Sequence, residues 1–238
     1  MSGRIALAIC LLATLSGGAL AQSASPKDQS SPPSPTAPAP NVATASDSGD
    51  QMDPPMLGDH WTYDIRDEIT GELKNTLTTT ITDLTPTDIA LRLQSQAYSQ
   101  GPSVFIYDRS WNLKNTPTWR FSPTDGSGIK MPLAVGNTWK FRYDQIRTGY
   151  GTTFKNVGAS KVVGTESIKT DAGTFEALKI ETSVTGHNAN DSTKRFESTI
   201  VTWYVPSIDH WVKRTVKSAF NGNVDENDSL ELVDFGRR

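Results

Sequence analysis

Apolar and polar side chains alternate with a period of two along most of the chain beyond residue 52. In the segment HWTYDIRD, Trp61, Tyr63 and Ile65 alternate with polar residues, and TWKFRYDQI repeats the pattern with Trp139 and Phe141. This alternation predicts β-strands that each bury one aromatic face. Other segments with strand-forming residues and flanking turn residues are 77–84, 87–96, 103–108, 160–168, 174–184, 196–205, 211–220 and 228–235.

No segment has the apolar spacing of an amphipathic helix, so the sequence predicts an all-β fold. Many strands at fairly regular spacing, with Thr abundant at strand positions, are typical of antiparallel β proteins. We expect a large curved antiparallel sheet, a half-barrel or a sandwich.

The chain contains the pattern Gly-x-x-Trp-x-aromatic twice, in GDHWTYDI from Gly58 and in GNTWKFRY from Gly136. After each copy come a strand, a turn and a second strand, and later a strand pair with Tyr before its turn and Trp after it. This common order predicts two related β-meander halves, residues 52–131 and 132–238, with chance similarity as the alternative. Gly58 and Gly136 would be turn residues that lead into strands.

Residues 1–21 have the organisation of a secretory signal peptide, with Arg4, an apolar run over 5–15, and small residues before an expected cleavage after Ala21. The apolar run is too short to span a bilayer, so we expect no transmembrane anchor after cleavage. The mature protein is expected to be periplasmic or secreted.

Cys10 is the only cysteine. Lipid attachment to its thiol is an alternative to removal with the signal peptide, but Ile9 stands where a small residue would be needed. Removal would leave a mature chain without thiols, which excludes disulfides and cysteine catalysis.

Residues 22–51 consist mainly of Ser, Pro and Ala, a composition that cannot bury enough apolar surface to fold. We expect a disordered linker there, followed by a β-rich domain over 52–238 that holds every Trp, Tyr and Phe of the chain.

The candidate chemistry is sparse. The net charge is −3 and the basic residues are scattered among acidic ones, which argues against a nucleic-acid partner. Neither a Gly-x-Ser-x-Gly motif nor a metal-binding His spacing occurs, so we predict no catalytic residue, no metal and no cofactor. The acidic segments 66–68 and 225–234 are interpreted as solvated turns and strand edges, with a glycosidase pair or a Ca²⁺ site as alternatives.

The tripeptide Asp-His-Trp occurs twice, with His60 and His210 at its centre. Two such imidazoles could meet only if their strands were neighbours. We therefore expect both histidines at the surface or at strand edges, with a shared His site as the alternative.

The aromatic residues give the sharpest hypothesis about binding. Several could line an apolar hollow that takes an acyl chain or a hydrophobic peptide. Filling of the core is the alternative, and platforms for sugar rings are a third interpretation. The candidate ligand-binding residues are Trp61, Tyr63, Trp139, Phe141, Trp203 and Trp211.

The second half also resembles a known family. The segments DAGTFEALKIE, TWYVPSIDHWVKR and SLELVDF, within residues 136–236, are similar to those of an uncharacterised family of exported bacterial β-rich domains. Members of that family resemble lipoprotein-carrier-like half-barrels, with a curved sheet around an apolar hollow. The matching motifs are turns and strand ends, so they imply a fold and no activity.

These observations favour an exported, non-enzymatic binding or accessory protein of the cell envelope. Its target would be a lipid or other hydrophobic ligand, or an envelope protein. The alternatives are a hydrolase of cell-wall glycans and a purely structural interaction module.

Overall fold

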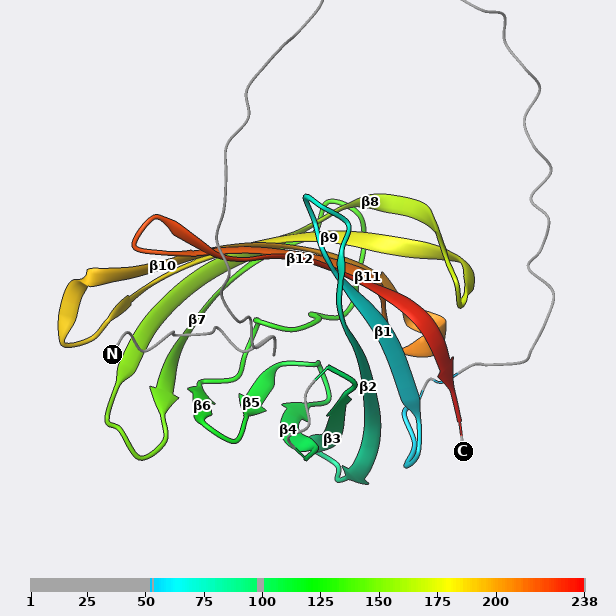
Figure 1. Ribbon diagram of the computed structural model, residues 1–238, viewed down its shortest axis with the longest axis horizontal. Helices are drawn as coiled ribbons and strands as arrows, with labels where there is room; N and C mark the ends of the chain where they lie inside the picture. Colours follow the sequence, from blue (N-terminus) through cyan, green and yellow to red (C-terminus); the bar gives the residue numbers. More distant parts are fainter. Residues whose placement is uncertain (1–51, 53, 98–100, 238) are drawn as a thin grey trace, which may run out of the picture.

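In the computed structural model, the described residues 52, 54–97 and 101–237 form a closed antiparallel barrel (Figure 1). The strand order around the barrel is β1-β12-β11-β10-β9-β8-β7-β6-β5-β4-β3-β2. The strands are β1 (His60–Asp67), β2 (Leu73–Leu84), β3 (Asp88–Ser95), β4 (Ser103–Asp108), β5 (Leu113–Asn115), β6 (Trp119–Ser122), β7 (Thr138–Arg147), β8 (Thr153–Thr170), β9 (Gly173–Asn188), β10 (Asp191–Val205), β11 (His210–Phe220) and β12 (Asn223–Gly236), and a 3₁₀ turn, η1, spans Pro206–Ile208.

The predicted all-β antiparallel architecture is confirmed, and the curvature goes as far as closure. β1 pairs with β12 from His60↔Gly236 to Asp67↔Asp228. Closure pairs the first strand with the last, so neither has a free hydrogen-bonding edge. No helix in the described part of the chain is long and apolar enough to cross a membrane.

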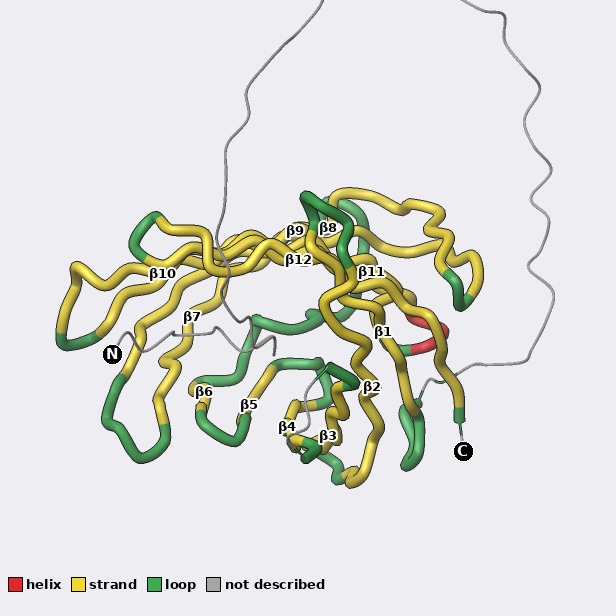
Figure 2. Tube along the Cα trace, in the orientation of Figure 1, coloured by secondary structure: helices red, strands yellow, loops and turns green. Residues whose placement is uncertain are grey.

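The barrel has two unlike sides. The long strands β8–β12 form one broad curved wall, and the short strands β3–β6 lie opposite it (Figure 1). The loop of residues 123–137 joins β6 to β7 and passes between these sides (Figure 2). It is anchored inside, because Trp139 Nε1 donates to the Gly126 carbonyl at 2.7 Å and Gly128 N donates to Asn112 Oδ1 at 2.6 Å.

The β8–β9 hairpin extends beyond its neighbours. Past Lys161, β8 pairs only with β9, and β9 pairs with β10 only from Leu178 onward. The free part of the hairpin packs against β12, where the ring centroids of Phe175 and Phe235 are 5.8 Å apart.

Alternation along the strands fills the barrel interior. Trp61, Tyr63 and Ile65 of β1 are at most 1% exposed, while the residues between them are half-buried. β7 repeats this arrangement with Trp139 and Phe141, each 8% exposed. Burial of such large aromatic faces is the main source of stability in a chain that has no disulfides among these strands.

The two Gly-x-x-Trp segments begin their strands in the same way. Gly58 and Gly136 have φ of 88° and 93°, values that favour glycine. Gly58 N donates to the Ile81 carbonyl at 3.0 Å, and Gly136 N donates to the Val162 carbonyl at 2.8 Å. Both glycines therefore lie in turns that lead into strands, and the origin of the domain from two related halves stays a prediction.

Candidate functional site

A cluster of aromatic rings fills one end of the barrel interior. His210 stacks on Trp61 with centroids 4.3 Å apart, and Trp111, from the β4–β5 turn, meets Trp61 edge-on at 5.9 Å. Tyr63 and Trp211 stack at 6.4 Å. Residues from β1, β11 and the β4–β5 turn thus form one packed group.

His210 is 1% exposed and stacks on Trp61 inside the barrel, so the expectation that it lies at the surface or at a strand edge is wrong. A β-bulge opposite Tyr204 interrupts the alternation, and both His210 and Trp211 are buried. Tyr63 Oη donates to the Trp211 carbonyl at 2.9 Å and lies 2.5 Å from His210 Nδ1, which assigns the imidazole proton to Nδ1. Burial, and secondarily the charge of Arg214, hold the pKa of His210 well below its usual value, so the ring is neutral.

Next to this cluster, the inner faces of the strands leave a half-open hollow of about 90 Å³. Its apolar wall includes Phe121, Phe141, Val184 and Ile200. Gly158 makes room for the Phe141 ring, because a Cβ there would lie 2.3 Å from Phe141 Cζ. The hollow is therefore shaped by the inner faces of β6, β7, β9 and β10.

Arg214 of β11 brings a charge into this hollow. Its Nε donates to Thr202 Oγ1 at 3.1 Å, and its Cζ lies 4.2 Å from the centroid of the Trp211 ring. Among the described residues, no carboxylate forms an ion pair with it. An arginine stays protonated even when partly desolvated, so this part of the barrel carries a cation.

A layer of polar side chains follows further along the inner face. Gln145, Asn156 and Ser198 are at most 4% exposed. Ser198 of β10 lies opposite Ser218 of β11, and Ser218 lies opposite Glu226 of β12. Glu226 therefore belongs to the same layer. Burial, with the charges of nearby aspartates, raises the pKa of Glu226 to about 8, so this carboxyl is mostly protonated at neutral pH.

We expect Glu226→Gln to stabilise the protein at alkaline pH. Because the pKa of the carboxyl rises from 4.5 to about 8 on folding, the folded state holds a proton that the unfolded state loses between these values. The contribution of Glu226 to stability is complete below pH 4.5 and is lost as the pH rises through 8. Urea unfolding should show the variant to be about 2–4 kcal/mol more stable than wild type at pH 9 and closely matched to it at pH 4.5.

Glu197→Gln is the control, because Glu197 is an exposed carboxyl on the outer face of β10. Its difference from wild type should stay within about 0.5 kcal/mol at both pH values. An equal effect of Glu226→Gln at pH 4.5 and pH 9 would contradict the assignment.

Five of the aromatic residues proposed from the sequence point into the barrel, and Trp203 does not. Trp61, Tyr63 and Trp211 form the end cluster, Phe141 lines the hollow, and Trp139 packs beside it. Trp203 lies on the outer face, where its ring contacts Lys179 at 5.3 Å and Lys213 at 5.8 Å. Its Nε1 donates to Glu166 Oε2 at 2.7 Å.

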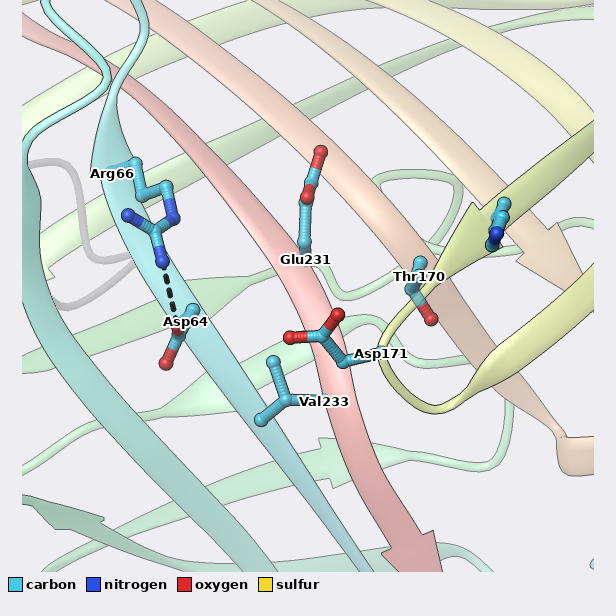
Figure 3. Close-up of a pocket in the computed structure, with 7 residues that line it drawn as sticks. Asp64, Arg66, Thr170, Asp171, Glu231 and Val233 are labelled. Atoms are coloured by element: carbon cyan, nitrogen blue, oxygen red, sulfur yellow. Dashed lines mark hydrogen bonds and ion pairs between the residues drawn. The ribbon is translucent and has the colours of Figure 1, made fainter.

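A second hollow, of about 230 Å³, lies on the outer face below the tip of the β8–β9 hairpin. Figure 3 shows Thr170 and Asp171 of this tip beside Val233 of β12. The other acids that line this second hollow already have partners, since Asp64 accepts from Arg66 at 3.0 Å and Glu231 accepts from Lys213 at 2.6 Å. The described residues contain no cluster of His, Cys, Asp or Glu that could hold a metal ion. We take the interior hollow as the candidate site, because it combines apolar walls with the charge of Arg214.

Sequence reasoning missed Arg214. A signal for it is present in WVKRTVKSAF, where Arg214 stands between Val212 and Val216 on the inward phase of the strand. A charged residue on the otherwise apolar inner face of a strand is unusual and marks a candidate site.

Comparison with known proteins finds similarity of fold only. No family model and no curated protein matches the sequence. One similar solved structure is a predicted lipoprotein of Parabacteroides distasonis, with 11% identity, a TM-score of 0.48, and coverage of 79% of this chain and 100% of that chain. Another is a predicted exported protein with a YmcC-like fold from Bacteroides fragilis, with 12% identity, a TM-score of 0.45, and coverage of 76% of this chain and 97% of that chain. A third is the hypothetical lipoprotein YmcC of Escherichia coli, with 9% identity, a TM-score of 0.45, and coverage of 77% of this chain and 86% of that chain. These proteins are described as lipoproteins or as exported.

Proposed function

We propose that this protein is exported and acts in the cell envelope as a non-enzymatic binding protein that holds a small ligand inside the barrel. The observation that carries the proposal is the hollow of about 90 Å³ between aromatic walls. An apolar wall that faces an unfilled hollow lacks dispersion contacts on that side. A ligand that fills it would restore those contacts.

The size of the hollow restricts the ligand. Sites for drug-sized molecules usually measure roughly 300–1,000 Å³, several times more than the space beside Phe121 and Phe141. The walls as they stand would accept a single ring, a short branched chain, or the end group of a longer molecule. A whole acyl chain is larger than this space.

Native mass spectrometry of the mature protein, residues 22–238, tests the proposal. Protein recovered from the cell envelope without detergent is expected to carry an added mass that disappears on organic extraction. Recovery of only the bare mass, under conditions that preserve known non-covalent complexes, would contradict it.

A matched pair of variants connects the bound mass with the hollow. Ile200 lines the hollow and Val201 faces the opposite side of β10. Ile200→Phe fills the space and should abolish the added mass, whereas Val201→Phe adds similar bulk outside and should leave it unchanged. Retention of the mass by Ile200→Phe would place the ligand elsewhere.

A further inference from the structure

We infer that the ligand of the interior hollow is a small monocarboxylate with an aromatic or branched apolar body, and that Arg214 is its counter-ion. This inference rests on the proposed function and names the class of ligand. It follows from the charge balance of the hollow, the donors that Arg214 has left, and the character of the opposite wall.

Arg214 forms no ion pair with a described carboxylate, unlike other cations of the barrel. Two other cations next to well-buried acids in this barrel are paired: Lys74 binds Asp228 at 2.5 Å, and Arg237 binds Asp59 at 3.0 Å. Arg214 has no such partner among the described residues, although it lies inside the barrel. Partial withdrawal of a cation from water without an anion is costly, and a bound anion would reduce that cost.

The ionisable groups that face Arg214 do not supply the missing anion. They are Tyr63, Tyr107, His210 and Glu226, which come from β1, β4, β11 and β12. Burial raises the pKa of Tyr63 well above its usual value and lowers that of His210, so both are neutral. Since the pKa of Glu226 is about 8, its carboxyl is mostly neutral at pH 7 as well.

The geometry of the guanidinium leaves donors for a ligand. Thr202 accepts from Nε, and the Trp211 ring lies against the guanidinium carbon at 4.2 Å. These contacts fix the plane of the group and leave the terminal nitrogens of Arg214 without a carboxylate acceptor among the described residues. Paired N–H donors in one plane suit a bidentate carboxylate.

The rest of the hollow selects the body of the ligand. Most of the remaining wall is apolar, with Phe121, Phe141, Val184 and Ile200, while Ser127 and Thr182 add hydroxyls. The volume of about 90 Å³ leaves room for little more than one ring or a branched chain. One guanidinium matches one negative charge, whereas a phosphate dianion would call for further cationic or N–H donors. A carboxylate on a compact apolar group satisfies both requirements.

Isothermal titration calorimetry at pH 7 tests the inference with benzoate, isovalerate and hexanoate, each against its own primary amide. At least one acid is expected to bind the wild-type full mature chain at least tenfold more tightly than its amide. This comparison needs no variant, so it remains decisive even if substitution of Arg214 disturbs folding. Equal binding of acid and amide would overturn the anion requirement while leaving the hollow as a binding site.

Variants and a second anion locate the effect. Arg214→Gln should weaken binding of the acid at least tenfold and leave binding of the amide unchanged, whereas Lys213→Gln, on the outer face beside Glu231, should change neither. Undiminished acid binding by Arg214→Gln would overturn the role of this residue. Inorganic phosphate bound more tightly than every acid would overturn the monocarboxylate class. Absence of binding by all acids and amides would overturn the inference, and the native mass measurement would then decide separately whether the hollow holds a ligand of another class.

Discussion

Replacing Trp61 with Ala is expected to lower the free energy of unfolding by about 3–5 kcal/mol. The indole is 0% exposed and packs against both the His210 ring and the Trp111 ring, so its removal leaves a cavity that the closed barrel cannot collapse to fill. Urea unfolding followed by far-ultraviolet circular dichroism measures the change.

Two further variants test the reason for this loss. Trp61→Phe keeps one ring against His210 and should recover at least half of the lost stability. Tyr150→Ala removes an aromatic side chain that is 72% exposed and should cost less than about 1 kcal/mol. A cost below 1 kcal/mol for Trp61→Ala would mean that the aromatic cluster does not support the barrel.

Replacing Lys74 with Met should destabilise the protein by a similar amount, about 3–5 kcal/mol. Lys74 of β2 contacts Asp67 of β1 at 2.8 Å and Asp228 of β12 at 2.5 Å, so it joins three neighbouring strands. The Asp228 side chain is only 4% exposed, and the substitution would leave its carboxylate buried without a cation. Urea unfolding at pH 7 checks the value.

Lys155→Met is the matched control, because it makes the same chemical change in an ion pair whose members are 56% and 40% exposed. Solvent and salt screen such a pair, so the expected cost is below about 1 kcal/mol. If both lysine variants lost the same stability, burial of Asp228 would not be the cause. Asp228→Asn combined with Lys74→Met should recover part of the loss, since the unpaired charge is then removed.

Strand positions could be predicted wherever apolar residues mark the inner face. The segment 103–108 coincides with β4, and the segment 211–220 differs from β11 by one residue. β8 was predicted to begin near Ser160 but begins at Thr153. Its inner positions there include Asn156 and Gly158, so the polar layer of the barrel removes the apolar half of the alternation and hides the strand.

The candidate site was predictable only in part, because strand periodicity assigns a face but not a partner. Phe141 could be placed on an inner face from its alternation with polar residues. Trp203 was placed on an inner face only because it is a large aromatic residue. Thr202 occupies the inner position beside it, and the indole lies on the outer face between two lysines. The stacking of Trp211 on Arg214 depends on a bulge, which no local pattern in the sequence encodes.

The pairing of β1 with β12 also determines when the domain can fold. His60 lies opposite Gly236, so the seam of the barrel joins the first and last parts of the folded chain. Closing so long a loop is entropically expensive, and topologies dominated by distant contacts fold slowly. A chain that emerges from its N-terminus, whether from the ribosome or across a membrane, can pair β2 to β11 with their sequence neighbours as they appear. β1 pairs early with β2, but its other edge must wait for β12, so a truncation before Asn223 would leave one edge of β1 and one edge of β11 open to pairing with other chains.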